Sequence, residues 1–157
     1  LDLDAEYADV WNRIGNVQYS KKEYEKSIEC YEEALKFKPK NKVFWSNIGN
    51  AYKNAKRYDE AIESYRKAVE IDPNYSDGWN RMGIAYRLKK QYDKAIECYE
   101  KVLSMNPKDK HALNNIGYVH ENREEFKKAA EFYEKALRID PDFETPNNAL
   151  KRIQSRL

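Results

Sequence analysis

The sequence predicts an all-α fold, a solenoid built from repeated pairs of helices. Three observations lead to this prediction. Residues recur at a fixed spacing of 34 along the chain. Within each repeat, apolar residues follow the 3.6-residue period of an α-helix. Each repeat also ends near a proline, which cannot continue a helical hydrogen-bond ladder. A period of about 20 to 50 residues is typical of repeat proteins, in which each unit packs on its neighbours.

The period is carried by several series of residues that share the same step. These are Gly15, Gly49, Gly83 and Gly117; Pro39, Pro73, Pro107 and Pro141; Trp11, Trp45, Trp79 and Leu113; Tyr24, Tyr58, Tyr92 and Phe126; and Tyr31, Tyr65, Tyr99 and Tyr133. Together they divide the chain into four units, residues 8–41, 42–75, 76–109 and 110–143.

The second unit shows the expected organisation of every unit. Its two apolar stripes are Trp45, Ile48, Gly49 and Tyr52, then Tyr58, Ala61, Ile62, Tyr65, Ala68 and Val69. We therefore expect two antiparallel helices of about 13 residues each, closed by Pro73. Glycine inside a helix costs about 1 kcal/mol relative to alanine. Its recurrence predicts that the two helices approach closely at that point.

The two ends of the chain differ from the four central units. Residues 1–7 resemble residues 69–75, so we expect them to be the remnant of a preceding repeat in a longer array. Residues 144–157 form a predicted capping helix, with Thr145 as N-cap and Pro146 at the first helical position. Its apolar stripe comprises Ala149, Leu150, Ile153 and Leu157. A helix with one polar face would end such an array.

The pattern Trp45-x-x-Ile48-Gly49-x-x-Tyr52, followed by Ala61, Tyr65, Ala68 and Pro73, resembles the tetratricopeptide repeat family. The resemblance implies a right-handed superhelix whose concave face is lined by the first helices. It also implies a non-enzymatic scaffold for protein–protein interaction. The chain departs from the family at the turn within each unit, where glycine is usual and this chain has Lys22, Lys56, Lys90 and Glu124. Either the turn has another geometry or the strain of a left-handed residue is tolerated, at about 1–2 kcal/mol each.

The first helices are expected to present a wall of polar residues rich in asparagine. Asparagine is a poor helix former, but its amide both donates and accepts hydrogen bonds, which suits the backbone of an extended peptide. Asn47 and Asn115 match an asparagine ladder in the tetratricopeptide arrays of glycosyltransferases that modify Ser/Thr with N-acetylglucosamine. The predicted peptide-binding residues are Asn12, Arg13, Asn16, Asn47, Asn50, Lys53, Asn80, Arg81, Ile84, Arg87, Leu88, Asn114, Asn115 and Tyr118. Their charges and apolar members predict an extended, acidic partner peptide with one apolar anchor.

Other binding functions remain open alternatives. The carboxylate clamp of chaperone-binding arrays is matched at Asn16, Asn47 and Arg81, but Asn12 and Asp77 stand where it requires cations. A homo-oligomer could form through an exposed face of the first repeat, near Tyr7 and Val10. Nucleic-acid binding is disfavoured, because Lys and Arg number 29 against 27 acidic residues and form no basic stripe.

Several other functions find no support in the sequence. It has no nucleophile–base pair and no glycine-rich phosphate loop, so we expect no enzyme activity. No metal or cofactor is predicted, since the two histidines and two cysteines lack ligand spacing. Cys30 and Cys98 lie two repeats apart, too far for a disulfide, and are expected on the outer face of second helices. No apolar run is long enough to span a membrane. We therefore expect a cytoplasmic protein.

Overall fold

The structure is a computed structural model, and it describes residues 3–156. Over this range it is helical throughout, without a strand, which confirms the all-α prediction. The helices are α1 (Leu3–Ser20), α2 (Tyr24–Phe37), α3 (Lys42–Asn54), α4 (Tyr58–Ile71), α5 (Ser76–Leu88), α6 (Tyr92–Met105), α7 (Lys110–Asn122), α8 (Phe126–Ile139) and α9 (Glu144–Ile153), followed by the 3-10 turn η1 (Gln154–Arg156). The chain divides into two compact units, residues 1–85 and 86–157, called unit 1 and unit 2 below.

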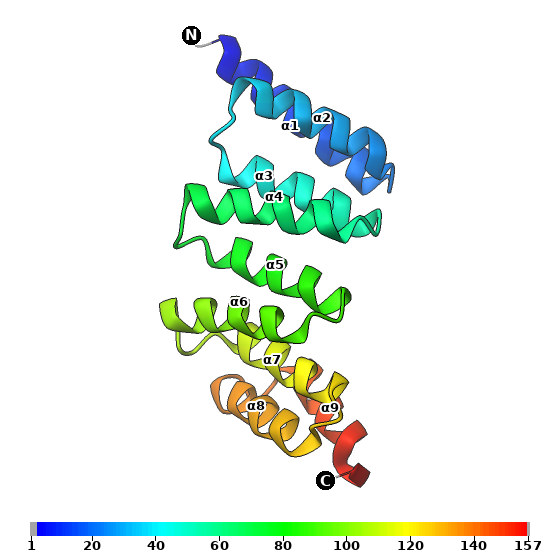
Figure 1. Ribbon diagram of the computed structural model, residues 1–157, viewed down its shortest axis with the longest axis vertical. Helices are drawn as coiled ribbons and strands as arrows, with labels where there is room; N and C mark the ends of the chain where they lie inside the picture. The colour runs from blue at the N-terminus through cyan, green and yellow to red at the C-terminus, as the bar shows by residue number, and fades with distance from the viewer. Residues whose placement is uncertain (1–2, 157) are drawn as a thin grey trace. The chain divides into compact units, whose positions relative to one another are not determined.

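In unit 1, helices that are neighbours in the sequence pack against each other. Figure 1 shows α1 beside α2 and α3 beside α4, and α2 also packs on α3. Small and large side chains interlock at these contacts, for example Ala34 and Ala51, both without exposed surface, with Tyr31, Ile48 and Phe44. This packing follows from the amphipathic stripes, because each helix is apolar on the face that meets its partner.

Unit 2 repeats the arrangement, with α6 against α7, α7 against α8 and α8 against α9. The last core cluster contains Tyr133 from α8 and Ala149 and Ile153 from α9. The apolar stripe predicted for the capping helix is therefore buried against α8. Leu157, the last member of that stripe, lies outside the described residues.

Two of the repeated glycines show why the position excludes a side chain. A Cβ atom added to Gly49 would lie 2.6 Å from Cε1 of Tyr65, and one added to Gly117 would lie 2.7 Å from the Tyr133 ring. In these repeats the tyrosine ring of the second helix therefore packs directly against the backbone of the first helix at the glycine. The close approach predicted from the recurring glycine is present.

The sequence left two alternatives for the turn inside each repeat, another geometry or a strained left-handed residue, and the structure shows the second. Lys22, Lys56, Lys90 and Glu124 all have positive φ, between 59° and 63°. In the second repeat, the Arg57 N–H donates to the Tyr52 carbonyl at 2.9 Å, across the left-handed residue. This is the bond pattern of a Schellman C-cap, which normally has glycine at the left-handed position. The chain therefore keeps the usual turn and carries the strain.

Expectations about several individual residues are wrong. Thr145 is not the N-cap of the last helix and Pro146 is not its first residue, because α9 begins at Glu144 with Phe143 as its cap residue. Cys30 and Cys98 lie on second helices, but they are buried (8% and 4% exposed) rather than on the outer face. They are buried because they lie on the buried stripes of their helices, four residues before Ala34 and Val102 respectively.

The start of the chain also differs from the segment it resembles. Residues 3–7 are helical and continue directly into α1, whereas the similar residues 71–75 end one helix and lead into the next. The difference has a simple cause: Ala5 stands where the later segment has Pro73, so nothing interrupts the helical hydrogen bonds.

Among the described residues, none of the helices combines the length and apolar character needed to cross a bilayer.

Candidate binding surface

The predicted wall residues of unit 1 come from the first helices α1, α3 and the start of α5. Arg13 and Asn16 are exposed, while the other members here are half-buried: Asn12, Asn47, Asn50, Lys53, Asn80, Arg81 and Ile84. Lys53 and Asn80 are each engaged by other residues of the chain. Half-buried polar groups with ordered partners are suited to presenting fixed hydrogen-bonding groups to a ligand.

Two amides of the wall are bonded to each other across adjacent first helices. The Asn47 side-chain nitrogen donates to the Asn12 side-chain oxygen at 2.9 Å. This pairing fixes the orientation of both amides, because the oxygen of Asn12 and the nitrogen of Asn47 are already hydrogen-bonded. The amide nitrogen of Asn12 and the amide oxygen of Asn47 lie outside this bond, so the pair still offers one donor group and one acceptor.

A second set of contacts, not anticipated from the sequence, comes from the buried tyrosines of the second helices. The Tyr31 hydroxyl donates to the Asn16 side-chain oxygen at 2.7 Å, and the Tyr65 hydroxyl donates to that of Asn50 at 2.8 Å. The signal was present in the sequence, since the tyrosine recurs in all four repeats and an asparagine follows the glycine in the first two. Asn16 and Asn50 are thus each oriented from beneath by a core tyrosine.

Arg81 is held in place by two side chains of unit 1. Its Nε donates to an Asp77 oxygen at 2.7 Å, and its NH1 donates to the Asn50 oxygen at 2.8 Å. Burial alone would lower the pKa of Arg81, but the hydrogen bond and charge of Asp77 outweigh it, and the pKa is raised. The guanidinium charge is therefore largely balanced within the chain. This weakens the carboxylate-clamp alternative, because a ligand carboxylate would compete with Asp77 for Arg81.

In unit 2, the predicted residues form a patch that is partly apolar. The Arg87 guanidinium lies over the Tyr118 ring, 4.5 Å from its centroid. Leu88 is 40% exposed and Tyr118 is 38% exposed. Asn115 is half-buried and engaged by other residues of the chain. Asn114 is a correction, because it is only 8% exposed and lies on the buried side of α7, out of reach of a docked peptide.

The hydrogen-bonding pattern of the tyrosines changes in this unit. Three buried side-chain atoms of the described residues have no hydrogen-bond partner: Nε of Arg87, the Tyr99 hydroxyl and Oδ1 of Asn114. At the sequence position where the first two repeats have Asn16 and Asn50, the third has Ile84, which has no acceptor for a tyrosine hydroxyl. Burial raises the pKa of Tyr99 to about 12, despite the opposing effect of Arg87.

In the fourth repeat the tyrosine has a charged acceptor instead. The Tyr133 hydroxyl donates to Glu121 at 2.6 Å, and Arg152 of α9 donates two hydrogen bonds to the same carboxylate. Burial would raise the pKa of Glu121, but the bonds from Arg152 and Tyr133 outweigh it and lower that pKa. The capping helix is thus tied to α7 and α8 by a group that sequence analysis did not single out.

Comparison with known proteins agrees with the fold. The family model described as Tetratricopeptide repeat matches residues 8–41, 43–75, 76–109 and 111–143. Among solved structures, the chain is similar to the MamA protein, with 25% identity over 93% of this chain and 82% of that chain, at a TM-score of 0.78. A MamA structure from Desulfovibrio magneticus RS-1 has a TM-score of 0.83 at 22% identity, covering 96% and 85%, a likeness of fold.

A third similar structure contains a ligand. The first such repeat module of Spaghetti (RPAP3), bound to the HSP90 peptide SRMEEVD, is 25% identical over 76% of this chain and 94% of that chain, with a TM-score of 0.71. Comparison with curated protein sequences found no match.

Proposed function

The chain belongs to the tetratricopeptide repeat family, and on that basis we propose that it binds an extended peptide segment of a partner protein along its first helices. Proteins of this family are in general non-enzymatic scaffolds for protein–protein interaction, and the similar RPAP3 module binds a peptide. In this proposal the chain binds its partner without covalent chemistry.

The observation that carries the proposal is the paired amide row of unit 1. Asn12 and Asn47 bond to each other, while Asn16 and Asn50 are fixed by buried tyrosine hydroxyls. Amides held in fixed orientations lose little conformational freedom when a ligand binds. A row that offers both donors and acceptors matches the alternating N–H and C=O groups of an extended backbone. Such contacts would grip the main chain with little dependence on its side chains.

Unit 2 supports a preference for an acidic peptide with one apolar anchor. Leu88 and Tyr118 supply exposed apolar surface, and Arg87 on the Tyr118 ring keeps a cation beside it. An apolar ligand side chain would contact Leu88, and a neighbouring Asp or Glu would approach Arg87. A chaperone-tail function of the clamp type is the weaker proposal, because Asp77 already occupies Arg81.

The test is selection from a random peptide library, followed by affinity measurement on a selected peptide. We expect enrichment of acidic peptides with one large apolar residue. The double variant N12A/N47A should bind a selected peptide at least tenfold more weakly. The matched control is N147A/N148A, which removes two exposed amides of α9. Failure to select any peptide, or equal binding by both double variants, would contradict the proposal.

Self-association is a second candidate function, favoured by one specific surface. Tyr7, Val10, Ile14 and Val17 are 55%, 51%, 38% and 51% exposed and lie on α1 at helical spacing. An apolar stripe of this kind is the face on which a repeat packs a neighbour. Sedimentation equilibrium of the chain and of a V10K/V17K variant tests it. A mass that rises with concentration for the unaltered chain only would favour a homo-oligomer through α1, whereas a constant monomer mass would exclude it.

The cytoplasmic location of the protein stays a prediction.

A further inference from the structure

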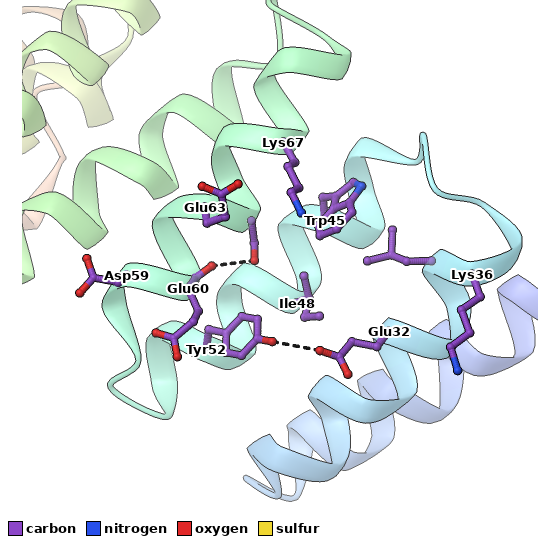
Figure 2. A pocket seen from close by; sticks show the side chains of 11 residues that line it. Glu32, Lys36, Trp45, Ile48, Tyr52, Asp59, Glu60, Glu63 and Lys67 are labelled. Atoms are coloured by element: carbon purple, nitrogen blue, oxygen red, sulfur yellow. Dashed lines mark hydrogen bonds between the residues drawn. The ribbon is translucent and has the colours of Figure 1, made fainter.

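A trench lies on the second-helix side of unit 1, between α2 and α4. It has a volume of about 550 Å³ and is floored by Leu35, Trp45, Ile48 and Tyr52. Figure 2 shows the side chains of α2 and α4 along its two sides and those of α3 between them. None of its lining residues belongs to the amide row of the first helices. We refer to it as the α2–α4 trench.

The charges of the α2–α4 trench are separated along its length. On α4, Asp59, Glu60 and Glu63 precede Lys67, and on α2 Glu32 precedes Lys36. Figure 2 shows Lys67 beside Trp45, and Glu60 and Glu32 beside Tyr52. From Asp59 to Lys67 a helix rises about 12 Å, at about 1.5 Å per residue. The trench therefore has an acidic end and a basic end separated by an apolar floor.

Two of these groups keep their charge available inside the trench. Glu32 accepts a hydrogen bond of 3.1 Å from the Tyr52 hydroxyl, which is a neutral donor and does not cancel the carboxylate charge. Burial, and then the Glu32 charge, raise the pKa of Tyr52, so the phenol stays protonated at neutral pH. At the other end, the Lys67 Nζ lies 4.3 Å from the centroid of the Trp45 ring, a contact that leaves its positive charge in place.

The acidic groups on α4 are less available, because Glu60 accepts a hydrogen bond of 2.9 Å from Arg57 and Glu63 is bonded to Arg66. Lys36 is paired with Glu33, and Asp59 is engaged by other residues of the chain. Glu32 and Lys67 are thus the charges that a ligand in the trench would meet.

This chemistry is not a general consequence of the repeat. One step of 34 residues further, Glu32 is replaced by Arg66. In the fourth repeat, Trp45 is replaced by Leu113, and Asp59 and Glu60 are replaced by Lys127 and Lys128. Surface positions on a solenoid are free to vary without affecting the core. One step further the two aromatic residues are kept as Trp79 and Tyr86, so the feature specific to the α2–α4 trench is the combination of this aromatic floor with the acidic residue Glu32.

We propose that the α2–α4 trench docks an amphipathic helix of about two to three turns from a partner protein, with a Lys or Arg directed to Glu32 and an Asp or Glu directed to Lys67. An apolar stripe on that helix would lie on Trp45, Ile48 and Tyr52, as in other helix-in-groove complexes. An extended strand fits less well, because the trench walls are helices whose backbone groups are bonded internally and offer no sheet edge. This second surface is separate from the peptide-binding surface proposed above.

The experiment uses a labelled synthetic helical peptide of 14 residues as the probe. It has Leu and Phe along one face, one Lys at one end of that face and one Glu at the other. Fluorescence anisotropy measures its binding to the whole chain. Glu32→Arg, which introduces the residue found at the same position of the next repeat, should weaken binding at least fivefold. A second peptide with Lys changed to Glu should regain the lost affinity for the Glu32→Arg chain.

The matched control is Glu100→Arg, which makes the same change at the same repeat position on α6 and should leave binding unchanged. Circular dichroism establishes that each variant is folded. Absence of binding by the first peptide, an equal loss in Glu100→Arg, or no rescue by the second peptide would each overturn the proposal. A chain mass that rises with concentration and returns to monomer in Glu32→Arg would instead assign the trench to a second copy of the chain.

Discussion

The tyrosines at positions 31, 65, 99 and 133 connect the core to the candidate binding surface. Each is at most 2% exposed, and the rings of Tyr31, Tyr65 and Tyr133 lie against the glycine of the first helix of their repeat. In three of the four repeats the hydroxyl at the far end of the ring reaches an oxygen on that helix: Asn16, Asn50 or Glu121. The same residue therefore packs the repeat and orients a surface group, so a core change here would also alter binding.

Gly49→Ala should destabilise the chain by about 1–3 kcal/mol, as expected for overpacking. The new methyl would meet the Tyr65 ring at 2.6 Å, and the fully buried ring has no space to retreat. Urea denaturation followed by circular dichroism measures the change. In a Tyr65→Leu background the same substitution should cost much less. Since alanine favours helix by about 1 kcal/mol over glycine, a stabilised Gly49→Ala chain would show that the ring does not constrain this position.

Lys56→Gly should stabilise the chain by about 1 kcal/mol, because it removes a side chain from a left-handed residue. The φ of Lys56 is 62°, and its turn already has the hydrogen bonds of a glycine-type cap. Thermal unfolding measures the gain. Lys101→Gly, the same change at an exposed position inside α6, should instead cost about 1 kcal/mol. A loss of stability in both variants would mean that no strain is stored at Lys56.

At the scale of the helices, α3 and α7 each begin at a side-chain cap. The Asn41 side chain accepts hydrogen bonds from the N–H groups of Val43 and Phe44, and this cap begins α3. The Asp109 side chain does the same for Ala112 at the start of α7. The capping helix α9 has no side-chain cap, and its attachment depends on its buried stripe and on Arg152.

Glu121→Gln should lower the free energy of unfolding at pH 7 by about 1 kcal/mol, a value reduced because Arg152 is half exposed. The folded pKa of Glu121 is lowered, so its contribution is present above the pKa of the unfolded carboxyl group, about 4.5. The contribution is lost as the pH falls through the lower, folded pKa. The stability difference between the two chains should therefore be constant near neutral pH and disappear in acid.

Urea titrations of both chains at pH 7, 5 and 3 measure this difference. Glu124→Gln is the control, because Glu124 is an exposed carboxylate in the turn that follows α7. A difference of the same size at pH 7 and at pH 3 would show that Glu121 acts through its shape and not its charge.

The sequence was sufficient to predict these elements but not their contacts. The glycine, proline and tyrosine series fix the helices of each repeat, because backbone restrictions and helical periodicity act locally. The left-handed Lys56 could not be predicted, since the alternative turn geometries differ by little energy. Asn114 and the two cysteines were placed on the wrong side of their helices, because one position of drift turns a side chain by about 100°. The α2–α4 trench was missed, since Trp45 and Tyr52 were interpreted only as core.

At the scale of the whole molecule, the helices that pack together are near neighbours in the sequence, within unit 1 and within unit 2 alike. The stability of such an array is approximately a sum of contributions from single repeats and from the interfaces between neighbours. A local change should therefore have local consequences.

Gly117→Ala provides a direct test of this expectation, because its added methyl would lie 2.7 Å from the Tyr133 ring in unit 2. Native-state hydrogen exchange should accelerate in α7, α8 and α9, by about tenfold for each 1.4 kcal/mol lost. The amides of α1 and α2 should keep their exchange rates. Gly15→Ala, the equivalent change in the first repeat, should produce the reverse pattern. If either variant accelerated exchange equally in all the helices, the chain would unfold as one cooperative unit, and interface energies between repeats would have to exceed those within them.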